Sequence, residues 1–255
     1  MKKAHPLTQR TLAWQDSLGI VTSEQSDPRA ASQDMIHNNP TETALVIAGA
    51  WNTAILSPEW VLLHGLQRQG EEPVQVLFPV GVGMIFEFPR YNVGDFSYVV
   101  RPDALIVAPP ETNGASIAAC EDAVARMVDI LKHTPVSGLG HNFEFRDEAP
   151  SDGCVNGFTA ARQDLVDQMP AGWEAASASI SSSFRNPDGS VVININRTLD
   201  AGVHVVKFNF HHVIGSVEQA LQVLRGGVEH RRMWENYTHA EQLMNQLYGE
   251  AGNGN

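Results

Sequence analysis

Short runs in which apolar residues recur between polar ones dominate the middle of the chain and predict β-strands. The first is Ala44–Ala48, and a group of four short runs follows a helical segment: Val74–Pro79, Met84–Phe88, Phe96–Val100 and Leu105–Ala108. Turn-forming Gly, Pro, Asn and Asp residues separate them. The links are too short for helical crossovers, so we expect antiparallel neighbours.

Two segments of the first half have features of helices. Ser57 is a typical N-cap, Pro58 suits the first helical position, and Gly70 ends the segment. The second segment carries an apolar stripe with spacings of three or four residues, which predicts a helix with one buried face. Its members are Ile117, Cys120, Val124, Met127 and Leu131.

Two later runs, GLGHNFEF at 138–145 and VVKFNFHH at 205–212, predict long strands, and each contains histidine next to Asn or Phe. Strand side chains alternate between faces, so His141 shares a face with its apolar neighbours. His211 instead shares a face with Lys207 and Asn209. We therefore predict that His141 points inward and His211 outward.

The second half contains a hairpin and a helical end. Trp173–Phe184 runs into the turn sequence RNPDGS and returns as Val191–Asn196. A helical segment begins at Ser216, and Gly226–Gly227 predicts a break within it. We expect a buried floor on which Leu221 and Leu224 pack. The floor residues are Ile193, Ile195, Phe208 and Phe210.

The fold class predicted from these elements is α+β, with two lobes of antiparallel sheet covered by helices and a long C-terminal helical segment. The breaker-rich stretch DEAPSDGCVNG at 147–157 predicts an exposed connector between the lobes, followed by a short helix over 160–168. The predicted parts are a polar N-terminal arm (1–43), a first lobe (44–146), a connector with a short helix (147–172), a second lobe (173–248) and a disordered tail (249–255).

Composition limits the partners of the protein. Of 255 residues, 43% are hydrophobic and 18% charged, and the formal net charge is −12. Such an acidic chain repels nucleic-acid phosphates and anionic lipid. There is no apolar run of about 20 residues and no signal peptide, so we predict a cytoplasmic protein without a membrane segment. Two cysteines, Cys120 and Cys154, are too few for a disulfide framework.

Signatures of catalysis are missing from the sequence. It has no Gly-x-Ser-x-Gly elbow, phosphate-binding loop or His-Glu-x-x-His helix. His204 and His212 are about 26 Å apart on one strand and cannot share a metal ion. We therefore predict no catalytic, cofactor-binding or metal-binding residues and no cofactor. The alternative is a small-molecule hydrolase or metal-dependent enzyme with a site between the lobes, built from His141, Glu144, His211 or Cys154.

The stretch VVININRTLDAGVHVVKFNFHHVIGS with its following helix resembles, in layout, a loose class of sporadically distributed bacterial proteins with two α+β lobes. The resemblance spans about residues 44–248 and carries over no catalytic residues. It implies a binding or regulatory component of a bacterial accessory system, such as a defence- or phage-related one. We therefore predict a non-catalytic binding or assembly protein that associates with a protein partner or with itself.

Overall fold

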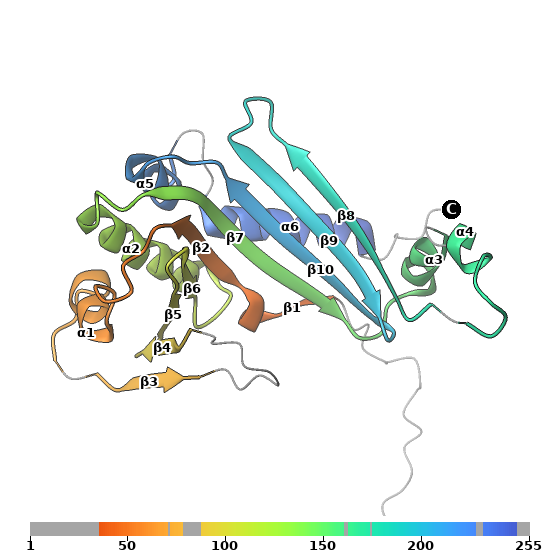
Figure 1. The fold of residues 1–255 in the computed structure, drawn as a ribbon, viewed down its shortest axis with the longest axis horizontal. Helices are drawn as coiled ribbons and strands as arrows, with labels where there is room; N and C mark the ends of the chain where they lie inside the picture. The colour runs from red at the N-terminus through yellow and green to blue at the C-terminus, as the bar shows by residue number, and fades with distance from the viewer. Residues whose placement is uncertain are drawn as a thin grey trace, which may run out of the picture. The chain divides into compact units, whose positions relative to one another are not determined.

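The computed structural model describes residues 36–70, 72–78, 88–160, 163–173, 175–227 and 232–248. They form a mixed α+β fold built on one ten-stranded antiparallel sheet (Figure 1). Neighbouring strands follow the order β3-β4-β5-β6-β2-β7-β10-β9-β8, and β1 pairs with the end of β7. The sheet is therefore made of strands from both halves of the chain.

The strands are β1 His37–Asn38, β2 Ala44–Gly49, β3 Val74–Leu77, β4 Arg90–Val93, β5 Phe96–Val100, β6 Ala104–Ala108, β7 Val136–Asp147, β8 Ser177–Arg185, β9 Val191–Asp200 and β10 Val203–His212. The helices are a 3-10 turn η1 Pro40–Glu42, α1 Pro58–Trp60 with its π-helical continuation η2 Val61–Gly65, α2 Gly114–Ile130, α3 Asp152–Ala160, α4 Gln163–Val166, α5 Val217–Arg225 and α6 Met233–Tyr248. The predicted strand Phe96–Val100 is confirmed, whereas residues 79–87 lie outside the described part.

The predicted separation into two lobes, each with its own sheet, is not confirmed. β7 pairs with β10 through nine residue pairs, from Leu139 opposite His212 to Asp147 opposite His204. The strands of both predicted lobes are thus hydrogen-bonded to one another. Local periodicity identifies a strand but carries no information on which distant strand it pairs with. Residues 1–35 of the predicted arm and the predicted tail lie outside the described residues.

The expected connector at 147–157 includes the start of a helix that the sequence did not predict, because α3 begins at Asp152. The Ser151 hydroxyl accepts a hydrogen bond from the Cys154 N–H at 3.3 Å, which stabilises the first turn. Further along, Phe158 is buried against the ring of His204. The stability gained from this packing outweighs the low helix propensity of Gly153 and Gly157, which favoured an irregular segment. The helix predicted over 160–168 corresponds to α4, with residues 161–162 outside the described part.

Phe208 and Phe210 of the expected floor are buried, whereas Ile193 and Ile195 are only partly buried. The rings that pack on this face of the sheet come from α6. Tyr237 lies 5.4 Å from Phe143 and 6.0 Å from Phe145 between ring centroids, and Phe210 lies 5.9 Å from His239. α6 passes behind β7, β10 and β9 in Figure 1. Leu224 is also buried, but it belongs to α5, which packs chiefly on α2.

The C-terminal helical region consists of two helices. α5 begins at the N-cap Ser216 and ends at Gly226, whose φ of +73° is a left-handed conformation that favours glycine. The break predicted at Gly226–Gly227 is therefore confirmed. In the described ranges, no helix combines the length and the apolar character needed to cross a lipid bilayer.

Candidate functional site

The two faces of β7 and β10 differ in chemistry. On one face, here called the helix face, lie Leu139, His141, Phe143 and Phe145 of β7, all buried, and α6 packs over them. The other, here called the open face, carries Gly140, Asn142 and Glu144 of β7 with Lys207, Asn209 and His211 of β10. His141 is 0% exposed, whereas His211 is partly exposed on the opposite side. The predicted inward and outward orientations are confirmed.

A row of amide and hydroxyl side chains crosses four strands of the open face. Asn142, Asn209, Asn194 and Ser183 lie opposite one another in the register of β7, β10, β9 and β8. Ser183 donates to Asn194 at 2.7 Å, Asn194 donates to Asn209 at 3.0 Å, and Asn209 donates to Asn142 at 2.8 Å. The hydrogen bonds run in one direction, so each amide is held in one orientation.

A second row lies next to the first. In register order its members are Glu144, Lys207, Asn196 and Ser181. Lys207 forms an ion pair with Glu144 at 2.9 Å, and Ser181 donates to Asn196 at 3.3 Å. Burial alone would raise the pKa of Glu144, but hydrogen bonds from Lys207 and Asn39 outweigh it and lower that pKa. Glu144 is thus charged and neutralised by Lys207.

These two rows, called the polar rows below, line a hollow of about 450 Å³. A Cβ atom at Gly140 would lie 2.9 Å from the Asn209 side chain, so the glycine gives that amide room to lie flat on the sheet. The hollow is lined by Asn and Ser residues, the ion pair of Glu144 with Lys207, and Glu42. Three apolar residues, Phe143, Ile195 and Phe208, also border it. Its chemistry fits polar, uncharged groups such as peptide amides.

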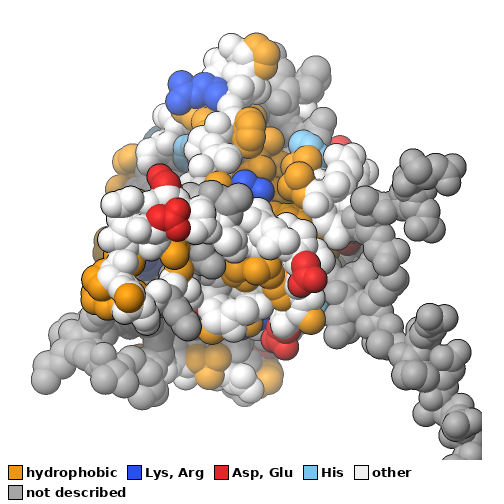
Figure 2. Space-filling model, turned by 90° about the vertical axis from the view of Figure 1, so that its right-hand side faces the viewer, with side chains coloured by type: hydrophobic (Ala, Val, Ile, Leu, Met, Phe, Trp, Pro, Cys, Tyr) orange, Lys and Arg blue, Asp and Glu red, His pale blue; other side chains and the backbone are white. Residues whose placement is uncertain are grey.

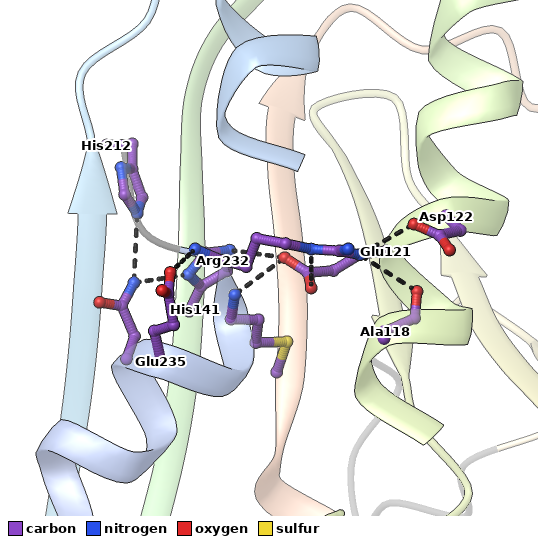
Figure 3. Close-up of polar contacts among 9 residues, drawn as sticks. Ala118, Glu121, Asp122, His141, His212, Arg232 and Glu235 are labelled. Carbon is purple, nitrogen blue, oxygen red and sulfur yellow. Dashed lines mark hydrogen bonds and ion pairs between the residues drawn. The ribbon is translucent and has the colours of Figure 1, made fainter. Parts of the chain in front are cut away.

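A buried polar cluster joins the helices to the helix face. Arg232, at the start of α6, forms ion pairs with two carboxylates of α2 (Figure 3). Its Nε lies 3.1 Å from Glu121 Oε2, and its Nη2 lies 2.8 Å from Asp122 Oδ1. The Met233 N–H also donates to Glu121 at 2.8 Å. Burial raises the pKa of the Glu121 carboxyl to about 7, although Met233 and Arg232 favour its charged form. Glu121 therefore acts as an N-terminal cap of α6 supplied by another helix.

Two histidines complete the buried cluster. The side-chain amide of Asn236 lies 2.9 Å from His141 Nδ1 and 3.4 Å from His212 Nε2. An amide NH2 can only donate, so both of these ring nitrogens accept. Burial lowers the pKa of His141 well below its usual range, and the neighbouring His212 lowers it further. His141 is therefore neutral, with its Nε2 turned towards Glu121 Oε1 4.0 Å away.

A third buried histidine lies near the other end of the sheet. His204 is 0% exposed and lies between the rings of Phe158 and Tyr248, at 5.5 and 4.7 Å. Burial lowers its pKa. Burial also raises the pKa of the Cys154 thiol, so that it is protonated at neutral pH and is a poor nucleophile.

The four residues of the alternative site do not converge. His141 is sealed on the helix face, Glu144 and His211 lie on the open face, and Cys154 belongs to α3. Glu144 is engaged by Lys207. Within the described ranges, no three or more His, Cys, Asp or Glu side chains are grouped so as to hold a metal ion.

The residues that the sequence reasoning missed are mainly uncharged. The polar rows were visible only as Asn and Ser at alternate positions of NIN, FNF and SSS. Glu121 lies four residues after Ile117 and three before Val124, which places a carboxylate inside the apolar stripe. That position was a signal for a buried charge with a partner.

The chain matches no protein-family model, and comparisons with curated proteins and with solved structures return no match either.

Proposed function

We propose that the protein is a non-catalytic binding or assembly protein that engages a polypeptide at the edge of its sheet formed by β8 and at the polar rows beside it. β8 is the last strand of the sheet and pairs with β9 along one side. Among the described residues, no strand pairs with its other side. This free edge is the observation that carries the proposal, because unpaired N–H and C=O groups are a template for an added strand.

Within the part of the chain that the structure describes, the β8 edge lacks most of the features by which sheets usually protect their edges. It is nine residues long, contains no Pro or Lys, and keeps a regular register with β9 from Ser177 to Arg185. By contrast, β3 at the opposite edge has four residues and follows Pro73. A strand of nine residues offers roughly 30 Å of backbone for pairing.

The surface around β8 fits a polypeptide partner. Figure 2 views the molecule from the right-hand side of Figure 1; hydrophobic side chains and atoms without a charged group predominate there, with separate small groups of acidic and basic side chains. Phe184 of β8 is 58% exposed and offers an apolar anchor. The polar rows reach β8 at Ser181 and Ser183, so an added strand would continue a surface already rich in hydrogen-bonding groups.

The alternative, a hydrolase or metal-dependent enzyme, gains no support from the geometry, because its four residues lie apart and the Cys154 thiol is protonated at neutral pH. Among the described residues, the open face of β7 and β10 offers no Phe, Tyr or Trp side chain for stacking bases, and the net charge is −12. We include in this proposal that the partner is a protein of the bacterial cytoplasm.

Site-specific photo-crosslinking in cells tests the proposal. A benzoylphenylalanine replaces Ser181 at the middle of β8 or, as a matched control, the exposed Glu218 of α5. We expect the probe at Ser181, and not the probe at Glu218, to crosslink to a discrete protein. A Pro substitution at Ser179 should abolish this crosslinked product. The melting temperature of that variant should stay above the growth temperature. Equal crosslinking from both positions, or none from Ser181, would contradict a binding role for this edge.

A further inference from the structure

We infer that β8 pairs with β8 of a second copy of this chain, antiparallel and centred on Ser181. The inference rests on the proposed function, because it names the partner of the same edge. It follows from three properties of the strand: its symmetry of register, its side-chain sizes and its charges.

The register follows from the two faces of the strand. In two copies related by a two-fold axis, the open faces lie on the same side of the joint sheet only if residues that face each other are both odd-numbered or both even-numbered. The axis then passes through one residue, which faces its own copy. Full overlap of Ser177–Arg185 puts Ser181 there. Ser179 of one copy then lies opposite Ser183 of the other.

The cross-strand pairs of this register fit in size and polarity. On the open face, serine meets serine at Ser179, Ser181 and Ser183, and these small side chains fit opposite one another. Each hydroxyl already donates to Asn194 or Asn196 of its own chain, so the hydrogen bonds between the copies are those of the backbone. On the helix face, Phe184 meets Ala178 of the second copy. The large ring thus lies beside a small side chain, and the apolar surface of Phe184, which is 58% exposed in one chain, is covered.

Charges near β8 are complementary across the same axis. Arg185 is the only charged residue of the strand, and its partner in the second copy is Ser177, whose neighbour on β9 is Asp200. Arg185 and the second copy's Asp200 would lie on one face about two strand spacings apart, roughly 10 Å between Cα atoms. An arginine side chain reaches that far. Symmetry makes two such pairs, which locally oppose the repulsion between two chains of charge −12.

The test is the mass of the full-length protein in solution, measured by size-exclusion chromatography with light scattering over a dilution series. One strand pair buries less than the roughly 1,600 Å² of a standard interface, so the dimer should be reversible. We expect a mass that approaches twice the 27.8 kDa of one chain at high concentration and falls on dilution.

Two matched double variants test the register. Ser179→Lys with Ser183→Lys places like charges opposite each other twice, whereas Ser179→Glu with Ser183→Lys places opposite charges there. Both remove the same hydroxyls. We expect the first variant to be monomeric and the second to dimerise at least as well as the parent, with equal far-ultraviolet circular dichroism. Gln75→Lys on β3 is the control and should leave the dimer unchanged.

A parent that stays monomeric at every concentration would overturn the inference, as would two double variants of equal mass. If a monomeric parent still gives a specific heterologous crosslink from Ser181, the inference fails and the proposed function stands. If that crosslink is also missing, both fail.

Discussion

His141 and His211 are two histidines on neighbouring strands that differ in their surroundings. His141 is sealed on the helix face and held by Asn236, whereas His211 is partly exposed on the open face. We predict that His141→Ala lowers the free energy of unfolding by about 2–4 kcal/mol through lost packing and a lost hydrogen bond. His211→Ala should cost less than about 1 kcal/mol. Urea denaturation of both variants measures the difference, and equal losses would contradict these placements.

The Glu121 carboxyl predicts a pH-dependent contribution to stability. Its pKa is raised from 4.5 to about 7 in the folded protein, so the folded state holds the proton more tightly than the unfolded state. The stability from this proton is fully present below pH 4.5 and is lost as the pH rises through 7. The unfolding free energy of the parent minus that of Glu121→Gln should therefore fall between pH 4.5 and 7. His141 is present in both proteins, so its titration largely cancels. A flat difference would show that Glu121 is charged throughout.

The start of α6 is an element whose stability depends on side-chain caps. The Arg232 N–H donates to Glu235 Oε2 at 2.9 Å, the reciprocal bond of a capping box. We predict that Glu235→Ala lowers the free energy of unfolding by about 1 kcal/mol. Glu235→Gln keeps an accepting oxygen and should lose less than half as much. Thermal unfolding of the two variants checks this, and equal losses would mean that charge alone is involved.

Individual elements could be predicted from the sequence, but their pairing could not. The strand Phe96–Val100 and the end of α5 at Gly226 follow from local alternation and from a residue suited to positive φ. α3 was missed because Gly153 and Gly157 count as breakers, while the burial of Phe158 against His204 depends on a contact between distant segments.

The polar rows could not be predicted for a similar reason. Asn142, Asn194 and Asn209 are spread over 67 residues and become neighbours only through the register of three strands. The faces of single strands were predictable, because alternation alone assigns His141 and His211 to opposite sides.

At the scale of the whole molecule, the charge of −12 opposes the association of two copies. Salt screens this repulsion over a Debye length of about 10 Å at 0.1 M. We predict that the dimer becomes tighter as the salt concentration rises from about 10 mM to about 0.15 M, because two exposed ion pairs contribute little by comparison. Sedimentation at several salt concentrations tests this balance. A dimer that weakens steadily with salt would show that the pairs of Arg185 and Asp200 dominate.

The most direct test of the account is hydrogen–deuterium exchange of β8 at high and low protein concentration. Strand pairing hides the outward N–H groups of Ser177–Arg185, so their exchange should slow at high concentration and recover on dilution. The exchange of Val74–Leu77 at the opposite edge should not change. Exchange of β8 that is independent of concentration, or protection that appears at β3 instead, would contradict the assignment of β8 as the pairing edge.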